Sequence, residues 1–291
     1  MSSRPPRYSH PSTADLSARI HPSAQVDRMA SLGVGVEIGP FAIVEAGASI
    51  GDGTRVLSSA YIATGTEVGA QCEIHMGAIL GHTPQIRDFK GPGGGLVIGD
   101  RTIVREYATV HRASTPGVKT FVGRDALLLG GCHVAHDGMI GDGVTIANGA
   151  LLAGFVCVGA HAFISGNVVV HQYVRIGEMA MIGGGLRVSK DVPPFMLVGR
   201  DSCVTGMNIV GMRRAGLTTD RRRRVRQAYG ILYRSALSVS HALERLRALP
   251  PSAETTAIVA FVEASSRGIC AASRGRNAGA RSHEADARSD E

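Results

Sequence analysis

Residues 134–170 read VAHDGMIGDGVTIANGALLAGFVCVGAHAFISGNVVV, and an isoleucine, valine or leucine returns at every sixth position of this stretch. The same spacing continues outward, over residues 20–80, 98–110 and 122–188. Helices and amphipathic strands have periods of about 3.6 and 2 residues, so neither produces this pattern. A six-residue period indicates a parallel β-helix, in which short strands stack into a prism.

Each unit of this repeat is expected to form one short strand and one corner. The branched anchor points into the prism, the small residue four positions later fits the narrow interior, and a glycine after the anchor permits the turn. Three units complete a coil, so residues three units apart lie in one column and pair through their backbones. Because each unit buries its face only against its neighbours, residues 19–199 form one quasi-linear domain.

The rest of the chain departs from this period. Residues 1–18 form a polar leader without the apolar stretch of a signal peptide. Two segments interrupt the repeat, residues 81–97 and 111–121, and they either preserve its register or loop out of the prism. The prolines of Lys190–Pro194 end the repeat, since consecutive prolines cannot continue a strand ladder.

A helical period follows, and residues 200–270 are expected to form a helical C-terminal domain. We expect helices at Leu217–Leu237, Val239–Leu249 and Ala253–Arg267. The tail, residues 271–291, has no core residues and is expected to be disordered.

Composition agrees with a solenoid, because aromatic residues make up only 4% of the 291 residues and columns of isoleucine, valine and alanine need few rings. The five cysteines contain no CxxC pair, which indicates reduced thiols in a cytoplasmic protein. No apolar run reaches the length of a membrane span, so no integral membrane segment is expected.

Much of the formal net charge of +7 lies in a cluster of arginines after the repeat. This cluster indicates either a solvated helix face or a docking surface for an acidic partner. Nucleic acid is not an expected partner, since stacking aromatics are not interleaved with the basic residues. The cluster consists of Arg213, Arg214, Arg221, Arg222, Arg223, Arg224 and Arg226.

The segment Cys132–Asp137 (CHVAHD) is the strongest candidate for chemistry. The columns place Gly154 one coil above His136, and Gln172 two coils above it. A histidine beside the carboxylate of Asp137, with a glycine N–H one coil away, can activate a hydroxyl or an amine towards a thioester. The imidazole would act as the base, the carboxylate would orient it, and the glycine N–H would meet the developing oxyanion.

Two other interpretations of these histidines remain open. His136 can be an ordinary surface residue of a solenoid. Alternatively, His133, His136 and His161 can bind zinc from neighbouring faces, although this spacing is not diagnostic.

Several motifs occur in the same order as in one known family. They are Val104–Arg112 (VREYATVHR), His133–Asp137 (HVAHD), Leu152–Gly154 (LAG), His171–Tyr173 (HQY), Lys190–Pro194 (KDVPP), Asn208–Gly216 (NIVGMRRAG) and Ser265–Ile269 (SSRGI). Through them, and over roughly residues 19–270, the chain resembles the UDP-N-acetylglucosamine O-acyltransferases that begin lipid A biosynthesis.

The resemblance implies a left-handed parallel β-helix with an α-helical C-terminal domain, assembled as a homotrimer with active sites between neighbouring prisms. The donor would be a 3-hydroxyacyl thioester on the phosphopantetheine of acyl carrier protein, and the acceptor a nucleotide sugar, with no metal and no other cofactor. His136 would be the general base, Asp137 would orient it, and the Gly154 N–H would stabilise the oxyanion. Gly184 would keep the acyl groove open, and the substrates would be bound by Gln85, His111, His133, His171, Gln172, Asn208 and Arg214.

The chain also departs from the family pattern. Phe155 stands where the family has a histidine, and the loop Gln85–Phe89 reads QIRDF where the family has QDLKY. Val210 and Ala215 replace an acidic residue and an arginine of the nucleotide site. These changes leave two alternatives: a paralogous O- or N-acyltransferase acting on another nucleotide sugar, or a non-catalytic trimeric scaffold.

Overall fold

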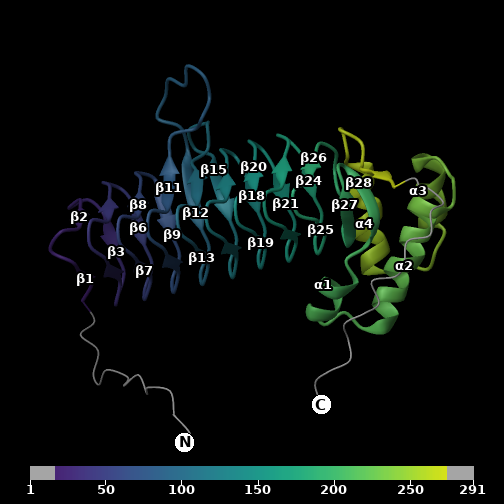
Figure 1. Ribbon diagram of the computed structural model, residues 1–291, viewed down its shortest axis with the longest axis horizontal. Helices are drawn as coiled ribbons and strands as arrows, with labels where there is room; N and C mark the ends of the chain where they lie inside the picture. Colours follow the sequence, from purple (N-terminus) through teal and green to yellow (C-terminus); the bar gives the residue numbers. More distant parts are fainter. Residues whose placement is uncertain (1–16, 274–291) are drawn as a thin grey trace, which may run out of the picture.

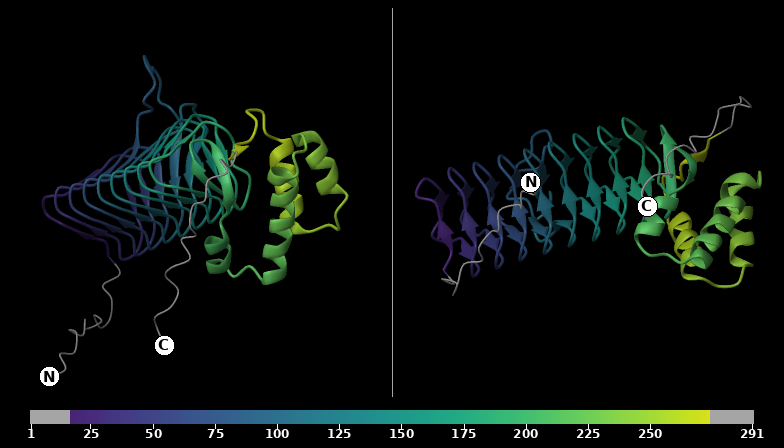
Figure 2. Two further views of the ribbon diagram at one scale, coloured as in Figure 1. Left: turned by 45° about the vertical axis from the view of Figure 1, so that its right-hand side comes forward. Right: turned by 60° about the horizontal axis from the view of Figure 1, so that its bottom comes forward.

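Residues 17–273 are described by a computed structural model, in which the chain winds into a long three-sided prism (Figure 1). Seen from a turned viewpoint, the coils lie one behind another, and helices stand beside the last coils (Figure 2). Apart from a hairpin after the last coil, each strand pairs in parallel with the strand one coil further along. The three faces are therefore three sheets, which we name A, B and C.

Sheet A contains β1 (Arg19–Ile20), β4 (Glu37–Ile38), β7 (Arg55–Val56), β10 (Glu73–Ile74), β13 (Ile103–Val104), β16 (Leu127–Leu128), β19 (Thr145–Ile146), β22 (Phe163–Ile164), β25 (Met181–Ile182), β27 (Met196–Arg200), β28 (Cys203–Met207) and β29 (Ala271–Ala272). Sheet B contains β2 (Gln25–Val26), β5 (Ile43–Val44), β8 (Tyr61–Ile62), β11 (Ile79–His82), β14 (Thr109–His111), β17 (His133–Val134), β20 (Leu151–Leu152), β23 (Val169–Val170) and β26 (Arg187–Val188). Sheet C contains β3 (Ser31–Leu32), β6 (Ser49–Ile50), β9 (Thr66–Val68), β12 (Gly95–Ile98), β15 (Lys119–Val122), β18 (Met139–Ile140), β21 (Cys157–Val158) and β24 (Arg175–Ile176).

The anchors of the six-residue repeat form the core of the prism. Ile146 in β19 and Leu152 in β20 have no exposed surface, whereas Leu151, one position earlier, faces outward and is 44% exposed. The small residue four positions after an anchor also points inward, as Ala150 does. The predicted parallel β-helix is thus confirmed, with one short strand for each unit of the repeat.

Both interruptions of the repeat loop out of the prism and leave its register intact. The Ala70 N–H donates to Asp100, 30 residues away, and the Ala126 N–H to Thr102, 24 residues away, where an uninterrupted coil separates such partners by 18, as for Val34 and Asp52. The two lengthened connections, residues 83–94 and 112–118, leave the prism between sheets B and C and protrude from it (Figure 1). The same corner of the prism therefore carries both loops.

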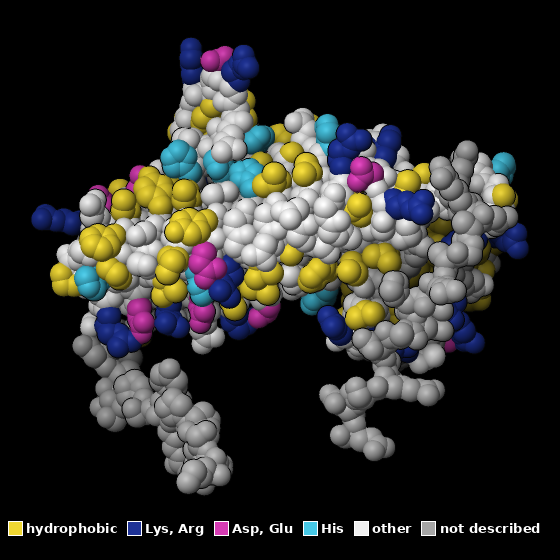
Figure 3. All heavy atoms as spheres, in the orientation of Figure 1, with side chains coloured by type: hydrophobic (Ala, Val, Ile, Leu, Met, Phe, Trp, Pro, Cys, Tyr) yellow, Lys and Arg dark blue, Asp and Glu magenta, His cyan; other side chains and the backbone are white. Residues whose placement is uncertain are grey.

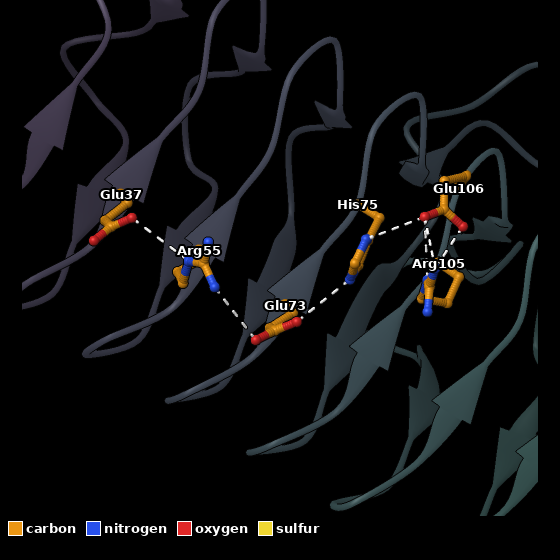
Figure 4. A network of polar contacts seen from close by, with 6 residues as sticks. All are labelled: Glu37, Arg55, Glu73, His75, Arg105 and Glu106. Carbon is orange, nitrogen blue, oxygen red and sulfur yellow. Dashed lines mark hydrogen bonds and ion pairs between the residues drawn. The ribbon is translucent and has the colours of Figure 1, made fainter. Parts of the chain in front are cut away.

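Basic and acidic side chains alternate over successive coils on the outer face of sheet A. Arg55 lies 3.5 Å from carboxylates of both Glu37 and Glu73, and His75 lies 3.4 Å from Glu73 and 3.3 Å from Glu106 (Figure 4). Exposed ion pairs contribute little individually. As a row they favour one register, because a slip between coils would separate every pair at once.

In the part of the chain that the structure describes, four helices follow the prism, namely α1 (Ile209–Arg214), α2 (Thr219–Arg234), α3 (Val239–Arg247) and α4 (Ala253–Glu263). At each of the four N-termini a polar side chain accepts a hydrogen bond from a backbone N–H of the first turn; these caps are Asn208, Thr218, Ser238 and Ser252. No helix among residues 17–273 is long and apolar enough to cross a membrane.

The helical segment differs from the prediction in three respects. The helical period of the sequence did not predict α1, which has only six residues. It also predicted that α2 and α4 end several residues later than they do. The hairpin of β27 and β28 extends sheet A, so strands continue past residue 200. Ala271–Ala272 forms β29 beside β28 although we expected disorder there, and residues 274–291 of the tail lie outside the described residues, as do residues 1–16 of the leader.

Replacing Ile146 by alanine should lower the free energy of unfolding by about 2–5 kcal/mol, because it leaves a cavity in a fully packed column. Thr145→Ala, on the outward position of the same strand, should change it by less than about 0.5 kcal/mol. Urea unfolding followed by circular dichroism at one protein concentration measures both. Equal losses would contradict the inward placement of the anchors.

Candidate active site

His136 and Asp137 occupy the corner between β17 of sheet B and β18 of sheet C. The His136 Nδ1 lies 2.7 Å from Asp137 Oδ2, and their side chains are only 14% and 6% exposed. The Ser114 N–H donates to both carboxylate oxygens, at 3.1 and 3.2 Å, and the Asp137 N–H donates to Thr120 Oγ1. An acceptor at Nδ1 assigns the proton to that nitrogen, which leaves Nε2 free to accept a proton. The pair is thus arranged as a base and the group that orients it.

Gly154 lies directly against this imidazole, one coil further along. A Cβ atom at Gly154 would stand 2.6 Å from His136 Cε1 and 2.8 Å from Nε2, so a side chain there would displace the imidazole. No backbone carbonyl of residues 17–273 accepts the Gly154 N–H. The predicted column of His136 and Gly154 is therefore present, with an unused backbone donor beside the imidazole.

Two aromatic rings continue the same corner. The Phe155 ring lies 5.3 Å from the His136 ring at an interplanar angle of 89°, and it stacks on Tyr173 at 4.7 Å and 14°. Phe155 is half-buried, whereas Tyr173 is 49% exposed. One side of the imidazole is thus covered by an apolar ring.

Histidines from neighbouring strands of sheet B lie close to His136. The His111 and His133 rings are 5.1 Å apart, and His82, which the sequence analysis did not select, lies 6.2 Å from His111. Burial lowers the pKa of His133 to about 4 and also lowers that of His111; neighbouring histidines add to both shifts. Both rings are therefore neutral at pH 7, which suits hydrogen bonding to hydroxyl groups. Figure 3 shows histidine side chains gathered at the base of the protruding loop.

His171 and Gln172 lie at the same corner, two coils beyond His136, and a segment from the end of the chain reaches them. The Arg267 guanidinium donates to Gln172 O at 2.8 Å and lies 3.2 Å from His171 Nδ1. Arg267 belongs to the SSRGI motif, yet the sequence analysis gave it no role in the site. Only the folded structure shows that the residues after α4 return to this corner.

Of the remaining predicted site residues, Gly184 and Asn208 lie at other corners of the prism than His136 in one chain. Gln85 is exposed in the protruding loop, and Gly184 lies at the corner between sheets A and B. Asn208 is buried and caps α1: its Oδ1 accepts from the Gly211 N–H, and its Nδ2 donates to Met179 O. Arg214 is exposed at the end of α1. A Cβ atom at Gly184 would make only ordinary contacts with this chain, so another molecule would have to cover that corner to form a groove.

The zinc interpretation finds no geometric support within residues 17–273. His161 lies beside Gly143 at the corner between sheets C and A, away from the corner of His133 and His136. No group of three or more His, Cys, Asp or Glu side chains in the described part of the chain is arranged to hold a metal ion.

The lowered pKa of His133 predicts a pH-dependent stability. His133 takes up a proton near pH 6.5 in the unfolded chain, but only near pH 4 in the folded chain. Because protonation therefore favours the unfolded chain, the stability that this histidine contributes is lost as the pH falls from 6.5 to about 4. Unfolding measured between pH 7 and pH 4 should therefore show a steeper decline for the wild type than for His133→Gln. Parallel declines would contradict the burial of His133.

Comparison with known proteins identifies relatives of this chain. Residues 191–270 match the family model described as UDP N-acetylglucosamine O-acyltransferase, domain 2. The acyl-[acyl-carrier-protein]–UDP-N-acetylglucosamine O-acyltransferase of Halorhodospira halophila is 46% identical over 86% of this chain and 98% of its own length. The enzyme of the same name from Verminephrobacter eiseniae is 41% identical over 87% of this chain and 99% of its own.

Solved structures show the same likeness. LpxA from Acinetobacter baumannii superimposes with a TM-score of 0.82 at 33% identity, over 88% of this chain and 99% of that one. The UDP-N-acetylglucosamine acyltransferase of Campylobacter jejuni gives a TM-score of 0.83 at 31% identity, over 87% and 99%. These matches confirm the left-handed sense of the β-helix. By fold, by the length of the matches and by identity, the chain belongs to the UDP-N-acetylglucosamine O-acyltransferase family.

Proposed function

We propose that this protein transfers a 3-hydroxyacyl group from the phosphopantetheine thioester of acyl carrier protein to the 3-hydroxyl of UDP-N-acetylglucosamine, the first step of lipid A biosynthesis. The observation that carries the proposal is the His136–Asp137 pair with the unused Gly154 N–H beside its imidazole. The Halorhodospira and Verminephrobacter relatives, which are named acyl-[acyl-carrier-protein]–UDP-N-acetylglucosamine O-acyltransferases, support an acyl transfer between these two substrates.

Each of these groups has a role in the proposed reaction. His136 Nε2 takes the proton of the sugar hydroxyl as its oxygen attacks the thioester carbonyl. Asp137 stabilises the imidazolium that forms, and the Gly154 N–H donates to the oxyanion of the tetrahedral intermediate. When the C–S bond breaks, the imidazolium returns its proton to the departing thiolate, and the ester and the free thiol are the products.

A second copy of the chain is needed to complete such a site. Gly184 belongs to one neighbouring corner of the prism, and Asn208, which is bonded to Met179, belongs to the other. A cleft between neighbouring prisms can bring the His136 corner of one chain to these residues of the next. This arrangement supports the homotrimer that the family resemblance implies.

The arginine cluster supports an acidic donor protein. Several of its members are engaged within the chain, since Arg221 pairs with Glu254 and Arg224 pairs with Asp220. Within residues 17–273, the side chains of Arg213, Arg214 and Arg226 form no ion pair with an acidic residue. A cleft of about 630 Å³ beside Arg226 and Pro250 offers space for a partner segment. The free thiols of all five cysteines support a cytoplasmic location.

The altered contacts around the acceptor favour a test of a second substrate. Val210, which replaces the acidic residue of the family, is 57% exposed on α1. A nucleotide sugar that carries a 3-amino group in place of the hydroxyl is the alternative acceptor, and the same base and oxyanion donor would serve it.

Mass spectrometry of UDP-N-acetylglucosamine incubated with a 3-hydroxyacyl carrier protein and the enzyme should show the mass gain of one hydroxyacyl group. His136→Ala should lower the rate by about 10²-fold or more, because it removes the general base. His161→Ala is the matched control, since His161 lies at another corner, and it should retain full activity. An unchanged rate in His136→Ala would exclude His136 as the base. If product formed only with the 3-amino sugar, that sugar and not UDP-N-acetylglucosamine would be the acceptor.

Mixing two inactive variants tests the shared site. If His136 of one chain works with Arg214 of the next, then His136→Ala and Arg214→Ala, mixed in equal amounts, dissociated and reassembled at random into trimers, should recover about a quarter of the wild-type rate in the whole mixture, since each mixed trimer would have one intact site in three. Each variant reassembled alone is the control and should stay inactive. Absence of recovery in verified mixed trimers would place both residues in the site of a single chain.

A further inference from the structure

The imidazole of His136 is bounded by three different groups. Asp137 binds its Nδ1, the Gly154 backbone lies against its Cε1 and Nε2, and the Phe155 ring stands perpendicular to it at 5.3 Å. A single hydrogen bond at Nδ1 fixes one point of the ring but permits it to swing about that point. A second contact, on the ring itself, is needed to fix the direction of Nε2.

Phe155 is itself held firmly. Its backbone has a φ of 61°, in the left-handed region that bulky residues rarely adopt, and its N–H donates to the His136 carbonyl at 3.1 Å. The Tyr173 ring stacks on it from the next coil, and the Tyr173 N–H donates to the Gly154 carbonyl at 3.1 Å. The two rings and the histidine therefore form a continuous series in which each member is bound to the coil before it.

The position of the ring favours contact with the base over contact with substrate. Phe155 is half-buried between His136 and Tyr173, and the exposed member of the series is Tyr173. A phenyl ring has no hydrogen-bonding group with which to select a sugar hydroxyl. What it can supply is a rigid surface against which the imidazole rests.

We propose that Phe155, supported by Tyr173, is a positioning residue that holds the His136 imidazole in the orientation in which Nε2 meets the acceptor hydroxyl. The role as stated rests on the proposed function, because it concerns the base of that reaction. Correct placement of a catalytic group is a large part of its effect, and aromatic pairs contribute enough to hold one orientation against others.

Phe155→Leu, which keeps an apolar side chain without the ring, should lower kcat by about 2- to 13-fold, the loss expected from one aromatic contact. The KM values for donor and acceptor should stay unchanged, because a positioning residue touches neither. Phe155→Tyr, which keeps the ring, should retain the wild-type kcat. Tyr173→Leu should act in the same direction with a smaller loss.

The same substitution in the His136→Ala background separates positioning from general damage. If Phe155 acts through His136, Phe155→Leu should cause no further loss of the residual activity of His136→Ala. An equal loss in both backgrounds would overturn the proposal, and so would a raised KM with an unchanged kcat, since the ring would then be a substrate contact.

A measurement that needs no turnover keeps this test independent of the reaction. In protein labelled with ¹³C-histidine, the Cε1–H resonance of His136, assigned by its loss in His136→Ala, should be displaced by the perpendicular ring and should move in Phe155→Leu. An unmoved resonance would overturn the proposal. A moved resonance in an enzyme that acylates neither acceptor would instead reject the proposed function and leave the contact between the two rings established.

Discussion

Parallel pairing between one coil and the next is the interaction on which this structure depends. Each two-residue strand is too short to be stable alone, and its backbone groups are satisfied only by the coils on either side. The inward anchors then form continuous columns in which residues such as Ile146 and Leu152 have no exposed surface. A residue at a fixed sequence distance from an anchor always lies at the same corner of its coil. The positions of the candidate site residues follow from this relation.

The candidate site is one such corner, between sheets B and C, repeated over three coils. The first coil presents His136 and Asp137, the second Gly154 and Phe155, and the third Gln172 and Tyr173. The left-handed φ of Asp137, Phe155 and Tyr173 turns the backbone in the same way in each coil. The three coils thus share one backbone geometry and differ in the side chains that they present. Groups that are 18 or 36 residues apart in the sequence therefore lie side by side at this corner.

Periodicity made the coils, the inward anchors and the column of His136 and Gly154 predictable from the sequence. It could not decide whether the two interruptions continue the coils or loop out of the prism. The anchors on either side of each interruption are separated by a whole multiple of six residues, and this spacing fits both interpretations. It also could not assign the corners relative to a second chain, so Gly184 and Asn208 were grouped with His136 although the single chain separates them. Arg267 was beyond reach for another reason: its contact with Gln172 arises from the path of the chain after α4, which no local pattern encodes.

The two inserted loops have a consequence for how such a protein can change. Both leave the prism and return to it without shifting the columns. Residues 83–94 can therefore vary in length and composition while His136 and Gly154 stay in place, whereas the loop at residues 112–118 carries Ser114, whose N–H donates to Asp137. The loop at residues 83–94 carries the altered stretch Gln85–Phe89, whereas His136, Asp137 and Gly154 belong to the coils of the prism. In the proposed function, acceptor binding by the loop at residues 83–94 and acyl transfer at His136 would be encoded in separate parts of one corner, and selection could change the first without disturbing the second.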